Sequence, residues 1–220
     1  MVKRTVPYNV KDVFVKHTYE SDGYTLPYLL YVPKSYDCGE MYPLMIFLHG
    51  AGERGDDNQA QLVHGLQSMF DDPTSPVYDS IIIAPQCPVN SQWVLTPWAE
   101  GNYLIYNTPE SKELESVCAV MDEITDCYNV DTDRVYITGL SMGGFGTWDL
   151  LARHGARFAA GMPVCGLAVK TVRNGRSINL DSRRQRIYGK LWMLTQPLRR
   201  PVYQLRHYAG AVRKKLTKKK

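Results

Sequence analysis

The sequence predicts an α/β fold in which a mostly parallel β-sheet carries helices on both faces. Residues 42–48 and 80–84 are short, continuous apolar runs, which are typical of central parallel strands that are covered on both sides. A stretch with helical periodicity follows the second run, and a further apolar run at 134–138 follows that helix. Strands and helices that alternate in this order indicate βαβ units.

The chain is expected to open with two strands, residues 13–16 and 24–31, around the turn Ser21-Asp22-Gly23. Pro85 ends the strand at 80–84, and residues 161–165 are expected to form the last strand of this pattern.

The long helix is expected to begin at Thr108, which is a favourable cap, with Pro109 at the first helical position and Glu110 in the first turn. Apolar residues then recur at spacings of three and four and define one buried face. These residues are Leu114, Val117, Met121, Ile124 and Tyr128.

The most informative motif is the G-x-S-x-G pentapeptide at residues 139–143, which has Ser141 at its centre. The run before it predicts a buried strand, and residues 144–151 predict a buried helix. This is the context of a nucleophile elbow, a sharp turn that holds a serine hydroxyl clear of the sheet. Gly139 and Gly143 lie where a Cβ would collide with neighbouring backbone. The alternative is a glycine-rich turn whose serine only caps the helix.

A glycine-rich loop, residues 49–55, follows the apolar run at 42–48. At the C-terminal end of a parallel strand, such a loop can present backbone N–H groups to an oxyanion, although an ordinary tight loop would have the same composition. His49 is interpreted as structural, because it lies at the strand end, where its ring can brace the loop.

These stretches resemble α/β-hydrolases of the serine esterase kind, similar to the polyhydroxybutyrate-depolymerase-like and feruloyl-esterase-like group and akin to prolyl-oligopeptidase-like catalytic domains. The stretches that carry the similarity are residues 43–55, 81–88 with Trp93, and 131–166. The resemblance implies an esterase-type reaction at Ser141. It also implies that the amides of Ala51 and Met142 form the oxyanion hole.

The charge distribution changes sharply at Gly166. Residues 1–165 contain 10 Lys and Arg against 21 Asp and Glu, whereas residues 166–220 contain 16 Lys and Arg and a single acid, Asp181. We therefore predict a hydrolase core over residues 1–166 and a basic tail outside the family pattern over 167–220. Our hypothesis is that the C-terminal part of the fold is truncated or replaced, either by translation in a shifted reading frame or by a foreign end. The tail could also be disordered. The alternatives are a genuine basic appendage for nucleic acid or anionic membrane, and a divergent but functional end.

The resemblance implies an acid and then a histidine after Ser141 in chain order. Asp181 and His207 have the right order and are the candidate acid and base, but neither has the Gly-x-x-Asp or Gly-His context of the family. His154 ends the elbow helix, beyond reach of Ser141. Activity is expected to be impaired if the acid and the histidine are missing.

Other classes of protein have little support in the sequence. There is no phosphate loop or dinucleotide fingerprint, so no cofactor is expected. Five cysteines without close metal-ligand pairing predict free buried thiols and no metal site. The N-terminus lacks a signal-peptide core, and no apolar run has transmembrane length, which predicts a cytoplasmic protein without a membrane partner, or else a secreted mature form.

The predicted function is hydrolysis of a carboxylic ester through an acyl-enzyme on Ser141. The substrate would be a small-molecule or polysaccharide ester, such as an acetyl or feruloyl ester. A serine peptidase, and an inactive hydrolase fold whose basic tail binds a polyanion, are the alternatives. The loop at 86–107 is rich in aromatic residues, which would either form a wall over Ser141 or pack within the fold. These residues are Trp93, Trp98, Tyr103 and Tyr106.

Overall fold

The computed structural model describes residues 8–97, 102–166, 168–173 and 176–179. The chain divides into two compact units, Met1–Arg183 and Arg184–Lys220, and every described residue belongs to the first. None of the helices in these ranges has the length and apolar character that a bilayer crossing requires.

The main sheet has the strand order β1-β2-β4-β3-β6-β7. The strands are Val15–Ser21 (β1), Tyr24–Tyr31 (β2), Tyr42–Leu48 (β3), Ile81–Pro85 (β4), Val130–Leu140 (β6) and Ala160–Val164 (β7). β4, β3, β6 and β7 pair in parallel in that order, whereas β1 pairs with β2 and β2 pairs with β4 in antiparallel fashion. The mostly parallel sheet is therefore confirmed. β1 starts later than predicted, because a short helix occupies the residues before it.

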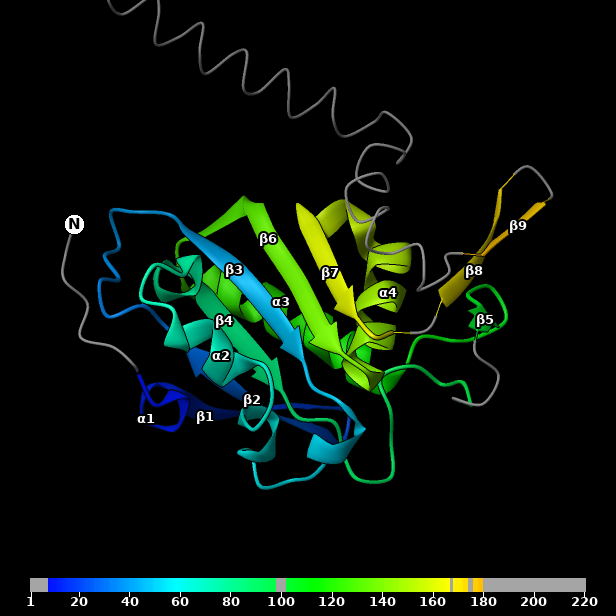
Figure 1. Ribbon diagram of the computed structural model, residues 1–220, viewed down its shortest axis with the longest axis horizontal. Helices are drawn as coiled ribbons and strands as arrows, with labels where there is room; N and C mark the ends of the chain where they lie inside the picture. The colour runs from blue at the N-terminus through cyan, green and yellow to red at the C-terminus, as the bar shows by residue number, and fades with distance from the viewer. Residues whose placement is uncertain (1–7, 98–101, 167, 174–175, 180–220) are drawn as a thin grey trace, which may run out of the picture. The chain divides into compact units, whose positions relative to one another are not determined.

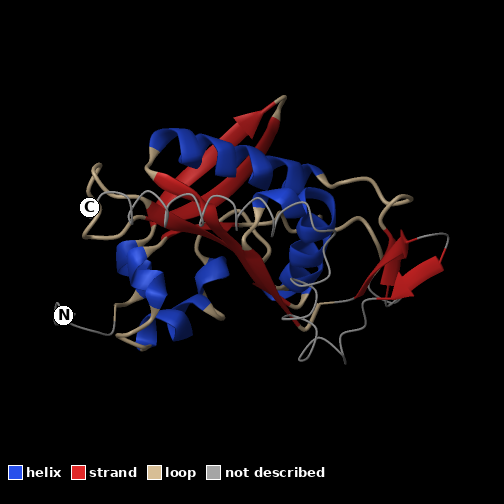
Figure 2. Ribbon diagram, turned by 90° about the horizontal axis from the view of Figure 1, so that it is seen from above, coloured by secondary structure: helices blue, strands red, loops and turns tan. Residues whose placement is uncertain are grey.

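Helices cover both faces of this sheet, as the sequence predicts. The short helices α1 (Val10–Val13) and α2 (Leu66–Asp71) lie on one face, and α3 (Lys112–Cys127) and α4 (Met142–His154) lie on the other (Figures 1 and 2). Phe47 of β3 and Phe70 of α2 belong to the apolar core beneath the first pair of helices. Short 3-10 helices lie in the connections between these elements: Ala51–Glu53 (η1), Ala60–Leu62 (η2), Pro76–Asp79 (η3) and Gly155–Arg157 (η5).

A second, smaller sheet was not predicted from the sequence. β5 (Asn102–Leu104) pairs in parallel with β8 (Ala168–Arg173), and β8 pairs in antiparallel fashion with β9 (Arg176–Asn179). Two of its strands therefore lie beyond Gly166, in the range that the charge distribution assigns to the tail.

The predicted start of α3 was wrong by one turn. Ser111, not Thr108, caps the helix, and the Ser111 hydroxyl accepts the N–H of Leu114 at 3.2 Å. The same hydroxyl donates to the carbonyl of Trp93 at 2.6 Å. This second bond fixes Ser111 in place from a distant part of the chain, so local cap preferences around Thr108 do not decide where the helix begins. The predicted apolar face is buried from Leu114 to Ile124.

Candidate active site

Ser141 lies at the junction of β6 and α4. It has φ 53° and ψ −115°, a left-handed region that non-glycine residues rarely adopt, and its side chain is exposed. Such a conformation costs on the order of 1–3 kcal/mol and persists only where the surrounding structure enforces it. The geometry is that of the strained strand-to-helix turn that the motif predicts.

Two glycines allow the turn to form. A Cβ on Gly143 would lie 1.9 Å from the carbonyl oxygen of Leu48, and a Cβ on Gly139 would lie 2.4 Å from the carbonyl oxygen of Gly143. Both contacts are with backbone, which cannot move aside as a side chain can. The predicted collision of a Cβ with neighbouring backbone is confirmed, and the close approach seats the start of α4 directly on the end of β3.

The capping alternative for Ser141 was wrong. Its side chain makes no capping hydrogen bond to α4. Backbone hydrogen bonds begin the helix instead: the N–H groups of Gly144 and Phe145 donate to the Ser141 carbonyl at 2.8 and 3.2 Å. No residue in the described part of the chain hydrogen-bonds the Ser141 hydroxyl, and the N–H groups of Met142 and Gly143 at the start of α4 have no partner within the helix.

The glycine-rich loop begins beside this turn. β3 and β6 are in parallel register, with Leu48 opposite Gly139. A Cβ on Gly50 would lie 3.6 Å from the carbonyl oxygen of Leu140, the residue before Ser141. Ala51 then starts η1, so its N–H is the first of that turn. The structure thus brings Ser141, Met142 and the Ala51 segment to the same end of the sheet.

The candidate acid and base cannot be placed in the same way. Asp181 and His207 lie outside the described residues. His154 is the last residue of α4, which with 13 residues is about 20 Å long. Because Ser141 precedes the other end of this helix, His154 is too far away to act on it.

Comparison with known proteins identifies the fold. A model of the prolyl oligopeptidase family matches residues 102–192. A crystal structure of a thermostable esterase is 38% identical, with a TM-score of 0.61, and the match covers 70% of this chain and 41% of that one. The described part of the chain is an α/β-hydrolase segment.

Two further relatives are also named as esterases. A bifunctional acetylxylan esterase/xylanase of Neocallimastix patriciarum is 29% identical over 108 residues, which are 43% of this chain and 16% of that protein. A ferulic acid esterase is 23% identical, with a TM-score of 0.51 over 67% of this chain and 58% of that one, and supports the fold. The chain thus spans less than two thirds of the length of each relative.

His49 braces the loop of the hydrolase segment, which confirms its structural interpretation. It is 1% exposed, its Nδ1 lies 2.6 Å from the carbonyl of Gly50, and its Nε2 accepts the N–H of Cys87 at 2.9 Å. The Nδ1–H tautomer satisfies both contacts. Burial lowers the pKa of His49 to about 4, against the opposing effect of the Gly50 carbonyl, so the ring is neutral near pH 7. Both of its nitrogens are engaged in the contacts above and are not available to a substrate.

The buried, neutral His49 predicts a loss of stability in acid. The ring takes up a proton near pH 6.5 in the unfolded chain but only near pH 4 in the folded one. Between these values the unfolded state binds more protons, so the free energy of unfolding falls as the pH falls, by up to about 3 kcal/mol. Urea unfolding at about pH 7.5 and about pH 4.5 measures this loss, which should be smaller in His49→Gln. Equal losses in the two proteins would contradict the assignment.

Two of the four aromatic residues in the loop at 86–107 pack within the fold. Trp93 is fully buried, and its Nε1 donates to the carbonyl of His49 at 3.0 Å. Tyr103 is also buried and donates to Asp149 of α4 at 2.5 Å, where Arg153 pairs with the second carboxylate oxygen at 2.6 Å. Tyr106 is 74% exposed. Trp98 lies outside the described residues. Trp93 thus packs beneath the surface and supports the glycine-rich loop at His49, and it does not line a substrate wall.

Further polar contacts, which the sequence analysis missed, hold the glycine-rich loop in shape. The Gln86 side chain is fully buried and donates to the carbonyl of Glu53 at 3.1 Å and to the Asp57 carboxylate at 2.7 Å. Glu53 in turn pairs with His64 at 2.7 Å. The loop is therefore rigid before any ligand arrives, which is the condition for backbone N–H groups to act on developing charge. Gln86 is part of the resembling stretch, but only its contacts identify this role.

Proposed function

We propose that this segment is the catalytic part of a serine carboxylic ester hydrolase, with Ser141 as nucleophile. The observation that supports this most strongly is the exposed Ser141 side chain at φ 53°, between a central parallel strand and the first turn of α4. A strained, exposed serine at a helix N-terminus has the hydroxyl and the local positive potential that acyl transfer needs. The esterase names of the relatives support the same reaction class.

In the proposed reaction, Ser141 Oγ attacks the carbonyl carbon of the ester. The negative charge that develops on the carbonyl oxygen is stabilised by the N–H groups of Ala51 and Met142. Collapse expels the alcohol and leaves an acyl-enzyme, which water then hydrolyses to the free acid and the serine. The Ser141 proton passes to a general base and from it to the departing alkoxide.

We propose Asp181 and His207 as the acid and the base, because they follow Ser141 in the required chain order. If they do not assemble with Ser141, the remaining nucleophile and oxyanion hole would support only residual catalysis, about 10³–10⁴-fold over water. A reactive phosphonate tests Ser141 whichever residue serves as its base, because phosphonylation requires a serine that a base has activated.

The proposed substrates are acetyl or feruloyl esters, free or on plant polysaccharide. This rests on one relative named as an acetylxylan esterase and another as a ferulic acid esterase. The prolyl oligopeptidase match favours a serine peptidase as the second candidate. Rates on an acetyl ester and on the matching anilide distinguish the two: both classes can cleave the ester, but only a peptidase should cleave the anilide at an appreciable rate.

Labelling of the full chain with a fluorophosphonate tests the nucleophile. We expect a single labelled serine in the parent protein, identified by peptide mass spectrometry, and no label in Ser141→Ala. Ser68→Ala removes another exposed serine, on α2, and should label like the parent. Label that persists in Ser141→Ala, or its absence in a folded parent protein, would rule out the proposal. In the second case, salt-sensitive binding to a polyanion would favour the inactive alternative.

A further inference from the structure

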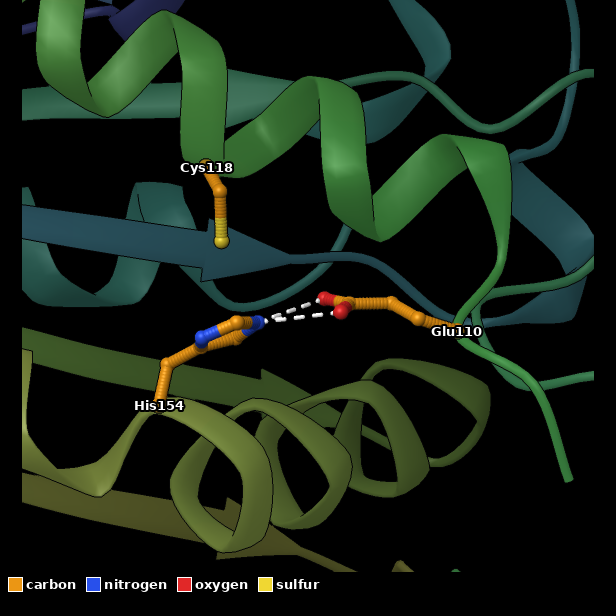
Figure 3. A group of neighbouring side chains, drawn as sticks. All are labelled: Glu110, Cys118 and His154. Atoms are coloured by element: carbon orange, nitrogen blue, oxygen red, sulfur yellow. Dashed lines mark hydrogen bonds and ion pairs between the residues drawn. The ribbon is translucent and has the colours of Figure 1, made fainter. Parts of the chain in front are cut away.

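Three side chains from separate elements meet at the far end of α4. Glu110 precedes α3, Cys118 lies on α3, and His154 is the last residue of α4 (Figure 3). One donor atom from each lies within 4.8 Å of the other two. Figure 3 shows the Cys118 sulfur directed toward the paired imidazole and carboxylate. These are three different types of metal ligand brought together by tertiary structure.

The spacing suits a tetrahedral ion after a small adjustment. His154 Nε2 lies 2.9 and 3.0 Å from the two carboxylate oxygens of Glu110. Ligands at ordinary zinc distances stand roughly 3.4–3.6 Å apart around the ion. The imidazole and the carboxylate would therefore separate by about half an ångström, and the sulfur would close in by up to about an ångström, through rotation about the side-chain bonds of these partly buried residues.

The surroundings permit access and limit competition. The side chains of His154 and Glu110 are 34% and 16% exposed, and an open cleft of about 700 Å³ borders Glu110. A water molecule that completed a tetrahedral site would have to enter from the side of the cleft at Glu110. Of the neighbouring cations, Arg153 pairs with Asp149, whereas Arg157 pairs with Asp122 and also donates to the backbone carbonyl of Cys118 at 3.5 Å.

We propose that Glu110, Cys118 and His154 form a Zn²⁺ site. The combination of nitrogen, sulfur and carboxylate oxygen favours Zn²⁺ over Mg²⁺ or Ca²⁺, which prefer all-oxygen sites. Binding replaces the thiol proton of Cys118, which passes to solvent, and the ion joins α3 to the C-terminal end of α4. The proposal departs from the expectation of no metal site, which was drawn from the sequence without tertiary contacts.

Direct binding measurements on the full chain test the site. We expect one Zn²⁺ per chain in competition with a fluorescent chelator, and no competition from Mg²⁺ or Ca²⁺. Cys118→Ser and His154→Asn should each weaken Zn²⁺ binding by more than about 100-fold. Loss of a residue that only hydrogen-bonds a metal ligand typically weakens metal binding by about 10–100-fold, so a larger effect indicates loss of a ligand. Cys127→Ser, which alters an exposed cysteine on the same helix, should bind Zn²⁺ like the parent chain. Equal affinity in all four proteins would overturn the proposal.

Two measurements on the parent protein do not depend on whether a variant folds. Bound Co²⁺ should give an intense near-ultraviolet thiolate charge-transfer band. Zn²⁺ should slow alkylation of Cys118 by a maleimide at least about tenfold, because the metal-bound sulfur is no longer a free nucleophile. Cys127 serves as the internal reference, whose alkylation should not change. If Zn²⁺ slows neither cysteine, or slows both equally, Cys118 is not a ligand. None of these readouts involves Ser141, so the proposed esterase reaction and the zinc site can fail separately.

Discussion

Replacing Ala51 with proline is expected to lower kcat for hydrolysis of an activated acetyl ester by about 10²–10³-fold, with KM little changed, because it removes one proposed oxyanion donor. The backbone can accept this change. Ala51 is the first residue of η1, and Gly50 before it is extended, with ψ 179°. Proline is favoured at the first position of a helical turn, and the residue before it prefers an extended conformation. The substitution therefore deletes an N–H with little other disturbance.

The matched control is Ala51→Gly, which shortens the side chain but keeps the N–H, and whose kcat should stay close to that of the parent protein. The rate of fluorophosphonate labelling at Ser141 gives a second readout. During phosphonylation, negative charge develops on the phosphoryl oxygen, which would occupy the same oxyanion hole as the ester carbonyl oxygen. Similar rates for the proline and glycine variants, with both proteins folded by circular dichroism, would show that the Ala51 amide is not an oxyanion donor.

Gly143→Ala is expected to lower the free energy of unfolding by more than about 3 kcal/mol, beyond the usual range for an overpacked core. The new Cβ would stand 1.9 Å from the Leu48 carbonyl oxygen and 2.8 Å from that of His49. Leu48 is the last residue of β3, which is hydrogen-bonded in the sheet and cannot retreat alone, and His49 follows it directly. Either α4 moves off the sheet or the strand end distorts. Urea unfolding followed by tryptophan fluorescence measures the loss.

Gly52→Ala is the control for this prediction. It lies in the neighbouring loop, where a Cβ would meet nothing within 4 Å, and its φ is not in the left-handed region. We expect a change of less than about 0.5 kcal/mol, as at ordinary surface positions. A Gly143→Ala protein as stable as Gly52→Ala would mean that α4 is not seated on β3 as the structure has it.

Local chemistry made the elbow predictable. An apolar run, a serine between two glycines and a buried helix occur within residues 134–151, and each part restricts the same short stretch of backbone. The central strands were predictable for the same reason, since continuous apolar runs are typical of strands covered on both faces, and most of Tyr42–Leu48 is buried. The role of His49 also followed from its place at the end of such a strand, although its partner Cys87 did not.

Other features depended on contacts between distant residues. The start of α3 at Ser111 depends on the carbonyl of Trp93, and the burial of Tyr103 depends on Asp149, 46 positions later. Glu110 and His154 are 44 positions apart, so no ligand spacing in the sequence could indicate their contact with each other or with Cys118. The prediction of buried thiols failed for Cys38, Cys127 and Cys165, which are exposed.

The sequence by itself determined the strained turn at Ser141 and the alternation of strands and helices around it. These are set by steric limits and periodicity within a few residues of each other. Only the tertiary structure decided which polar groups meet, from His49 against Cys87 to the cluster at Glu110. Such meetings depend on how α3 and α4 dock on the sheet, and a hydrogen-bonding side chain is suited to many partners until that packing selects one.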